Sequence, residues 1–285
     1  MKRILVLLSL TLACAFSATA QDDLLDLLDA EQEEPENFVE ATFKGQRLIN
    51  GHTVQTRKKS ELEFVIAHRF GRINQGIDEF FGLDGANIRF SLEYGLSDRL
   101  TAAIGRNSFQ KVYDGFLKYK LLKQKSGGAN PVTMTWFSSV AIRTLENPAF
   151  ETDDFNSKVS YTHQMLIARK MNETLSLQLT PTYIHRNKVL ENQENDIMAL
   201  GFGGRYKLSS RVSLNAEYFY RLTDELNDDF KDALGIGIEI ETGGHVFHLN
   251  FTNARSMAER AFITETDGDF FGGDIHFGFN ISRTF

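Results

Sequence analysis

Residues 87–94 read Asn-Ile-Arg-Phe-Ser-Leu-Glu-Tyr, a stretch in which polar and apolar side chains alternate. Successive side chains of a β-strand point to opposite faces, so the stretch predicts a strand with one apolar and one polar face. The apolar face carries Ile88, Phe90, Leu92 and Tyr94. The polar face carries Arg89, Ser91 and Glu93. Such a strand fits a sheet whose two sides meet different surroundings.

The same period of two recurs from residue 61 onward, in segments mostly about 8–12 residues long. A tilted strand needs about 9–11 residues to cross a bilayer. The pattern predicts about twelve strands, an even number that leaves both chain ends on the periplasmic side. The predicted strands are 61–70, 87–94, 99–106, 114–122, 132–142, 158–168, 174–184, 196–206, 211–221, 232–240, 245–252 and 274–285.

The connections between these segments mostly alternate between long and short. Outer-membrane barrels show this alternation, because their periplasmic turns are tight and their external loops are longer. The third and fourth connections, 107–113 and 123–131, differ little in length. A thirteenth strand-like segment, 41–49, would break the even count, so we expect it to pack at the periplasmic mouth or to fold into the lumen.

A soluble β-sandwich is the main structural alternative, since its strands also alternate. The final segment favours a barrel, because its alternating apolar residues and terminal Phe resemble the signal that the barrel-assembly machinery reads. That signal consists of Phe277, Phe279, Ile281 and Phe285. No strand edge stays unpaired in lipid, so the strands must close. We therefore predict an all-β protein, a closed antiparallel transmembrane β-barrel in contact with outer-membrane lipid and with the assembly machinery.

The N-terminal region is organised differently. Residues 1–20 have the basic start, short apolar run and Ala18-Thr19-Ala20 cleavage site of a signal peptide. A lipoprotein site before Cys14 is the alternative, although Thr11-Leu12-Ala13 matches it poorly. Residues 21–60 are predicted to form an acidic periplasmic segment, with a short helix or tail over 22–29 that is either solvated or docks on a periplasmic partner. The barrel is predicted over 61–285.

Composition excludes several classes of function. The net charge is −7, and no basic stripe exists to neutralise phosphates, which argues against a nucleic-acid partner. Cys14 is the one cysteine and leaves with the predicted signal, so the mature chain has no thiol chemistry and no disulfide. His248 and His276 face inward on neighbouring strands, but no carboxylate has suitable spacing, and we predict no metal or other cofactor.

The chain also resembles a known family. The residues that carry the resemblance are Phe43-Lys44, Glu61-Leu62-Glu63, His68-Arg69-Phe70-Gly71, Phe81-Gly82-Leu83-Asp84, Ile88-Arg89, the run 114–119, the run 273–280 and Ser282-Arg283. They are similar to the membrane-bound β-barrel proteins of Gram-negative bacteria that are classed as a domain of unknown function. The resemblance covers nearly the whole mature chain. It implies a barrel in the outer membrane and no particular reaction.

If the apolar face meets lipid, the polar face lines the lumen. The predicted lumen-lining residues are Glu63, Arg69, Arg89, Glu93, Lys118, Lys120, Glu217 and Arg221. Opposite charges in so narrow a space are expected to pair. Two functions fit: a narrow porin-like channel for small polar solutes or ions, or a structural barrel that binds partners without transport. In the second, the N-terminal segment or the loops 71–86, 143–157 and 253–273 supply the contact surfaces.

An enzyme is the third alternative. No G-x-S-x-G or H-E-x-x-H motif occurs, and we predict no catalytic residues. Ser138 and His163 lie on the apolar faces of neighbouring segments, in a register that places them opposite each other. Such a pair resembles the arrangement in outer-membrane phospholipases, but no third residue orients the histidine. The favoured interpretation is a barrel without enzymatic activity.

Overall fold

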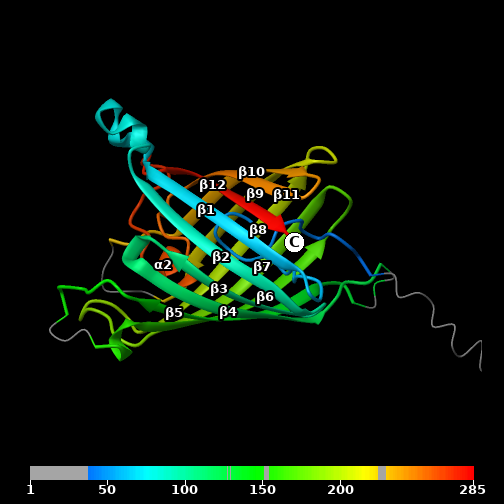
Figure 1. Ribbon diagram of the computed structural model, residues 1–285, viewed down its shortest axis with the longest axis horizontal. Coiled ribbons are helices and arrows are strands. Elements are labelled where there is room, and N and C mark those ends of the chain that lie inside the picture. The colour runs from blue at the N-terminus through cyan, green and yellow to red at the C-terminus, as the bar shows by residue number, and fades with distance from the viewer. Residues whose placement is uncertain (1–37, 127, 129, 151–153, 224–228) are drawn as a thin grey trace, which may run out of the picture. The chain divides into compact units, whose positions relative to one another are not determined.

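Twelve antiparallel strands form a closed barrel in the computed structural model (Figure 1). The structure describes residues 38–126, 128, 130–150, 154–223 and 229–285. The predicted signal peptide, 1–20, and the acidic helix or tail at 22–29 lie outside the described residues. The predicted all-β barrel is confirmed.

Each strand pairs with its neighbours in sequence, and the first pairs with the last. Ile66 of β1 lies opposite Phe90 of β2 and opposite Ile281 of β12, so the sheet has no free edge. Predicted boundaries differ from the observed ones by at most three residues. The strands are β1 Leu62–Arg72, β2 Ala86–Ser97, β3 Leu100–Asn107, β4 Val112–Leu122, β5 Thr133–Arg143, β6 Val159–Lys170, β7 Leu175–Arg186, β8 Asp196–Lys207, β9 Val212–Arg221, β10 Ala233–Thr242, β11 His245–Thr252 and β12 His276–Thr284.

The two faces of the barrel wall differ sharply in exposure. On β2, Leu92 is 42% exposed, whereas its neighbour Glu93 is 0% exposed. The outer face is therefore apolar, and the inner face carries charged and polar groups. No helix among the described residues is long and apolar enough to span a membrane.

Connection lengths identify the two ends of the barrel. Short turns at 98–99, 171–174, 208–211 and 243–244 mark the periplasmic end, where β12 also ends. Longer connections join the strands at the outer end. Two connections depart from this pattern. The short connection 108–111 lies at the outer end, and the longer connection 123–132 lies at the periplasmic end. Within the described ranges, four short 3₁₀ helices span Ile73–Gln75, Ile77–Gly82, Phe109–Lys111 and Asn156–Lys158.

Two segments fill the lumen. The first is the N-terminal hairpin, residues 42–56, in which Arg47 pairs with His52 and nearly every residue is buried. In Figure 1 this blue chain lies within the barrel. The 41–49 segment therefore folds into the lumen, the second of the two placements that the sequence allowed. The other segment is α2, Glu259–Thr264, whose six residues are all buried.

The position of α2 corrects one expectation. The connection 253–273 is one of the surfaces that a partner-binding barrel was predicted to use, but much of its first half is buried. Apolar side chains explain the inward course, because Phe262 and Ile263 pack with Ile184 and Phe219 of the wall. The hairpin makes a matching cluster, in which Phe43, Leu48 and Val54 pack with wall side chains that include Phe116 and Phe137. Each inserted segment is therefore held partly by apolar burial.

Candidate functional site

The lumen holds most of the charged residues that the sequence assigned to it. Seven of the eight predicted lumen-lining side chains are less than a tenth exposed: Glu63, Arg69, Arg89, Glu93, Lys118, Lys120 and Glu217. Arg221 is half-buried at the outer end of β9, where its Nη2 atom donates to the carbonyl oxygen of Phe230. Arg69, Lys118 and Glu217 hydrogen-bond to the hairpin. The part that the eight residues play in a solute path stays a prediction.

The tip of the hairpin is held by one carboxylate. Oε1 of Glu217 accepts a 2.7 Å hydrogen bond from the backbone N–H of Asn50. Oε2 of the same side chain accepts from the backbone N–H groups of Ile49 and Gly51, at 3.1 and 3.0 Å. Hydrogen bonds to an ionised acceptor are stronger than neutral ones, so Glu217 is the main polar anchor of the tip.

Arg69 holds the same tip from the other side. Its Nη2 donates to Oδ1 of Asn50 at 2.9 Å and to the carbonyl oxygen of Ile49 at 3.2 Å. Its Nη1 donates to Oδ1 of Asn280, whose own Nδ2 donates to the Ile49 carbonyl at 3.0 Å. The tip therefore lies between a wall carboxylate and a wall guanidinium, two of the predicted lumen residues.

The arms of the hairpin bind amide, hydroxyl and ammonium groups of the wall. Oε1 of Gln178 accepts from the Val54 N–H at 3.0 Å, and its Nε2 donates to the His52 carbonyl at 2.7 Å. Thr135 donates to the Val54 carbonyl at 2.8 Å. Lys118 donates to the side-chain oxygen of Gln46 at 2.6 Å. Wall side chains thus take the place that a neighbouring strand or water fills for an ordinary hairpin.

The two inserted segments contact each other. Nη1 of Arg47, in the hairpin, lies 2.9 Å from Oε1 of Glu259, in α2. Nε2 of His52 lies 3.3 Å from the same oxygen. The His52 ring packs against Phe116 and Phe137, with ring centroids 4.6 and 4.5 Å apart. The hairpin is therefore connected to the outer connection through a buried ion pair.

Several wall charges pair with one another, as expected. Arg89 of β2 forms an ion pair with Asp114 of β4, across the strand between them. Gly105 of that strand makes room, because a Cβ there would lie 2.6 Å from Nη2 of Arg89. Nε of Arg205 lies 3.0 Å from Oε1 of Glu239, which also has His248 nearby at 3.4 Å through its second oxygen. These pairs satisfy buried charges at the wall.

Several residues of the site escaped the sequence analysis. Asp114 shares the parity of Lys118 and Lys120 along β4, so strand alternation contains the signal that would have found it. Gln178 has a similar signal on the polar face of β7. Arg47 lies in the strand-like segment 41–49 and Glu259 lies in an outer connection, and period-two patterning does not predict that the two residues meet.

The predicted serine–histidine pair exists on the outer face. Ser138 lies directly opposite His163, and Oγ is 2.9 Å from Nδ1 of the ring. Trp136 and Tyr183 stack on either side of that ring, with centroid separations of 6.0 and 6.4 Å. In the described part of the chain, the ring makes no ion pair or hydrogen bond with a carboxylate. The pair thus has a plausible nucleophile and base without the group that usually orients the base.

The two histidines considered for a metal site lie apart in register. His248 lies opposite Asn280, whereas His276 lies opposite Thr252. His248 contacts Glu239 and the Leu48 carbonyl, and His276 contacts the Phe70 carbonyl. Across the described residues, no group of three or more histidine, cysteine or acidic side chains is arranged to hold a metal ion.

Three residues of the predicted assembly signal, Phe277, Phe279 and Ile281, lie along the outer face of β12, and Phe285 directly follows that strand. Phe277 stacks on Phe70 with ring centroids 5.6 Å apart, and Phe279 stacks on His68 at 5.1 Å. Ile281 lies opposite Ile66 of β1, and Phe285 is 64% exposed. This strand closes the barrel against β1. Recognition of these residues by the assembly machinery stays a prediction.

Comparison with known proteins agrees with this architecture. A family model described as a membrane bound beta barrel domain (DUF5777) matches residues 43–285. The solved structure of the NanC porin superposes with a TM-score of 0.51 at 8% identity, covering 79% of this chain and 98% of that one. An outer membrane channel of Pseudomonas putida F1, COG4313, gives a TM-score of 0.48 at 12% identity, with coverages of 80% and 96%. No curated protein sequence matches the chain.

Proposed function

The chain belongs to the family of membrane-bound β-barrel domains, and we propose that it is an outer-membrane channel for small polar solutes or ions, closed by its own N-terminal hairpin. The observation that carries the proposal is the attachment of residues 42–56 to the wall through polar contacts. The wall side chains that bind the hairpin would line a water-filled path through the lumen once the hairpin is displaced.

The inner wall has the composition of a solute path. Side chains that face the hairpin include Thr135, Gln178, Glu217 and Asn280. A barrel that served only as a scaffold would be equally stable with apolar side chains filling its interior. Polar groups along the wall instead retain hydrogen-bonding capacity for water or solute when the hairpin is displaced.

The closed state is expected to predominate at rest. Phe43, Leu48, Ile49 and Val54 are all almost fully buried, and burying such a side chain contributes roughly 1.5–3 kcal/mol. Displacement of the hairpin therefore requires work or a ligand. We propose that a periplasmic partner displaces the hairpin by binding the part of the acidic N-terminal segment that precedes it.

The alternative is a structural barrel that binds partners and transports nothing. The buried connection α2 and the paired wall charges favour it, because they add closed packing to the lumen. The lipid-facing hydrolase is the less favoured second alternative. Its support is the Ser138–His163 hydrogen bond, and we propose that this bond only satisfies two polar groups at the lipid face.

Conductance of the refolded protein in planar bilayers separates channel from scaffold. A Cβ at Gly203, on the inner face of β8, would lie 2.3 Å from Cδ1 of Leu48 in the hairpin. Gly203→Phe should therefore expel the hairpin and give a steady channel, whereas the wild type opens rarely. Gly204→Phe is the matched control, because a Cβ there meets Leu177 at an ordinary 3.4 Å on the outer face. A folded Gly203→Phe barrel without conductance supports the scaffold.

A further inference from the structure

The apolar outer face of the barrel has a hollow that lies over β1 to β5. Its volume is about 570 Å³, within the range of about 300–1,000 Å³ that is typical of ligand sites. The outward-pointing side chains that line this hollow are apolar or aromatic, apart from Arg106 of β3. They include Phe64, Leu92, Tyr113 and Val140. The hollow therefore belongs to the surface that meets lipid.

The hollow exists because Gly115 of β4 has no side chain. Gly115 lies opposite Ile104 of β3 on one side and opposite Val140 of β5 on the other. Ile104 is therefore 67% exposed, whereas Leu92, its neighbour on β2, is 42% exposed. A Cβ at Gly115 would meet the carbonyl oxygen of Ala103 at an ordinary 3.5 Å. The wall has room for a larger side chain here, and such a side chain would fill the hollow.

Arg106 lies at the outer edge of the hollow. It is opposite Tyr113, one outward-facing pair nearer the outer end of the barrel than Ile104 and Gly115. The Arg106 side chain is exposed, and its Cζ atom lies 5.5 Å from the centroid of the Tyr113 ring. Aromatic residues near the strand ends mark the interface between hydrocarbon and lipid headgroups. We therefore expect the guanidinium to lie at the height of the headgroups.

The charge of Arg106 is not neutralised by the protein. No carboxylate in the described part of the chain forms an ion pair with it. Asp114, which follows Tyr113, has its side chain on the inner face, where it pairs with Arg89. Lys111 is exposed at the same end of β4 and adds a second positive charge. A cation on a lipid-facing surface is costly unless water or an anion meets it.

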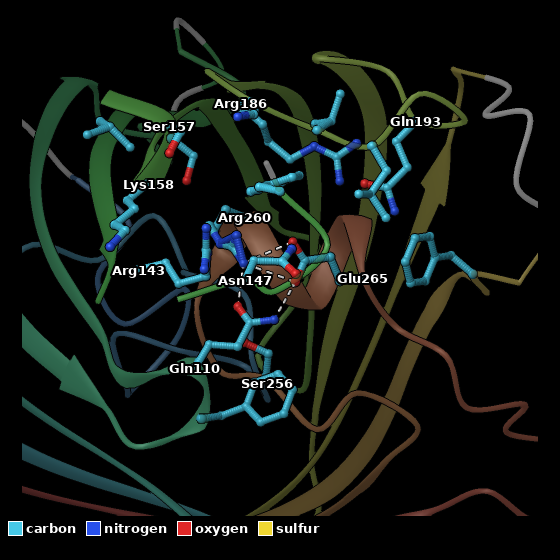
Figure 2. A pocket seen from close by; sticks show the side chains of 18 of the residues that line it. Gln110, Arg143, Asn147, Ser157, Lys158, Arg186, Gln193, Ser256, Arg260 and Glu265 are labelled. Atoms are coloured by element: carbon cyan, nitrogen blue, oxygen red, sulfur yellow. Dashed lines mark hydrogen bonds and ion pairs between the residues drawn. The ribbon is translucent and has the colours of Figure 1, made fainter. Parts of the chain in front are cut away.

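The connection that follows Arg106 is held over the lumen and leaves the hollow open. Nε2 of Gln110 donates to Oε2 of Glu265 at 2.9 Å, and the side-chain oxygen of Gln110 accepts from Nη2 of Arg260 in α2. Figure 2 shows these three side chains pointing toward one another in the cavity at the outer end. The short connection 108–111 is thus tied to the inserted helix, away from the lipid face.

We propose that the hollow binds one phosphorylated lipid of the outer leaflet, with an acyl chain against Gly115 and the phosphate on Arg106. A guanidinium presents parallel N–H donors that match two oxygens of a phosphate. The lipid-facing position and the adjacent positive charge together favour this occupant, because a soluble phosphate has no group for the apolar surface. The inference does not depend on whether the barrel conducts.

A second hollow on the outer face provides a comparison. It has a volume of about 720 Å³, and its outward-pointing side chains include Tyr206, Leu214 and Phe251. The one charged residue among its described lining residues is Arg205, which points inward and pairs with Glu239. We therefore expect this second hollow to accept acyl chains without preferring a phosphate.

Native mass spectrometry of the refolded full barrel tests the site with three probes. Phosphatidic acid has the chains and the phosphate, diacylglycerol with the same chains lacks the phosphate, and glycerol 3-phosphate lacks the chains. We expect phosphatidic acid to bind about tenfold more tightly than diacylglycerol, because it adds a charge-assisted hydrogen bond. Glycerol 3-phosphate should not bind at the same concentrations. Equal affinity for the two lipids overturns the inference, and so does glycerol 3-phosphate that binds as tightly as phosphatidic acid.

Two variants connect the phosphate preference to Arg106. Arg106→Gln should lower the affinity for phosphatidic acid about tenfold and leave that for diacylglycerol unchanged. Arg99→Gln removes the same charge from an exposed position directly before β3, at the periplasmic end, and should change neither affinity. A heat-dependent gel shift verifies that both variants are folded. Equal effects of the two substitutions on phosphatidic acid overturn the assignment of the phosphate to Arg106.

Two further variants connect the acyl chain to the hollow. Gly115→Leu should weaken phosphatidic acid, because the new side chain occupies the space of the acyl chain. Gly204→Leu is the matched control, since Gly204 lines the second hollow, and this substitution should leave the affinity for phosphatidic acid unchanged. Equal affinities in the two variants would show that the chain lies elsewhere and would overturn the site.

Discussion

The backbone N–H of Asn50 donates a 2.7 Å hydrogen bond to the carboxylate of Glu217, and these two residues are 167 positions apart in sequence. The contact joins the tip of the N-terminal hairpin to the middle of β9. Because the same carboxylate also binds the N–H groups of Ile49 and Gly51, one side chain anchors three consecutive backbone amides.

Glu217→Gln should loosen the hairpin while preserving the shape of the side chain. The amide NH₂ cannot accept from the hairpin, so at least one of the three hydrogen bonds is lost. A loss of about 1.5–3 kcal/mol corresponds to an increase in channel openings of roughly tenfold or more. Single-channel recording measures the effect, with Glu173→Gln at an exposed periplasmic turn as the control. Identical opening frequencies in the two variants would count against the anchor.

Glu259→Gln should uncouple α2 from the hairpin. The substitution leaves the buried guanidinium of Arg47 without its carboxylate, and removing one partner of a buried pair costs about 3–5 kcal/mol. We expect the connection 253–275 to become sensitive to protease added to intact cells. Arg47→Met combined with Glu259→Gln should be less sensitive than Glu259→Gln alone. A connection that stays resistant in the single variant contradicts the coupling.

Asp114→Asn should destabilise the barrel wall rather than the hairpin. Arg89 is then buried without its ion-pair partner, at a cost of roughly 3–5 kcal/mol. The temperature at which the folded band disappears in a heat-dependent gel shift should fall. Asp78→Asn, in an exposed outer connection, should leave it unchanged. The double variant Arg89→Met, Asp114→Leu should recover much of the lost thermal stability. An Asp114→Asn barrel whose folded band disappears at the wild-type temperature would refute the importance of this pair.

The wild-type barrel should not hydrolyse phospholipid. Ser138 and His163 satisfy each other at the lipid face, and no carboxylate among the described residues orients the ring. Release of fatty acid from mixed micelles should equal the blank for both the wild type and Ser138→Ala. Activity in the wild type that disappears in Ser138→Ala would establish the hydrolase alternative instead.

Much of the barrel was predictable because a wall between lipid and a polar lumen forces strict alternation. Alternation alone assigned Phe90 of β2 to the lipid face and Glu93 to the lumen. The same reasoning placed Ser138 opposite His163. Even parity excluded 41–49 from the wall and left two placements, the periplasmic mouth and the lumen, of which the structure shows the lumen.

The contacts of the inserted segments were not predictable in the same way. Glu217 was placed in the lumen, but its partners depend on where the hairpin tip stops, which no local period determines. The inward course of Glu259–Thr264 depends on a match between Phe262 and wall residues such as Phe219, which lie far away in sequence. The contact of Gln110 with Arg260 and Glu265 arises in the same way, between two outer connections that are far apart in sequence.

A reversible covalent lock tests the central claim most directly. A Cβ at Gly235 of β10 would lie 3.2 Å from Cβ of Ile49, close to the about 3.5–4.5 Å spacing of a disulfide. A chain produced from residue 21 has no cysteine of its own, so Ile49→Cys with Gly235→Cys introduces one bond. In the Glu217→Gln background, we predict a silent barrel when oxidised and frequent openings after reduction. Equal conductance before and after reduction, with the bond verified by mass, would contradict closure by the hairpin.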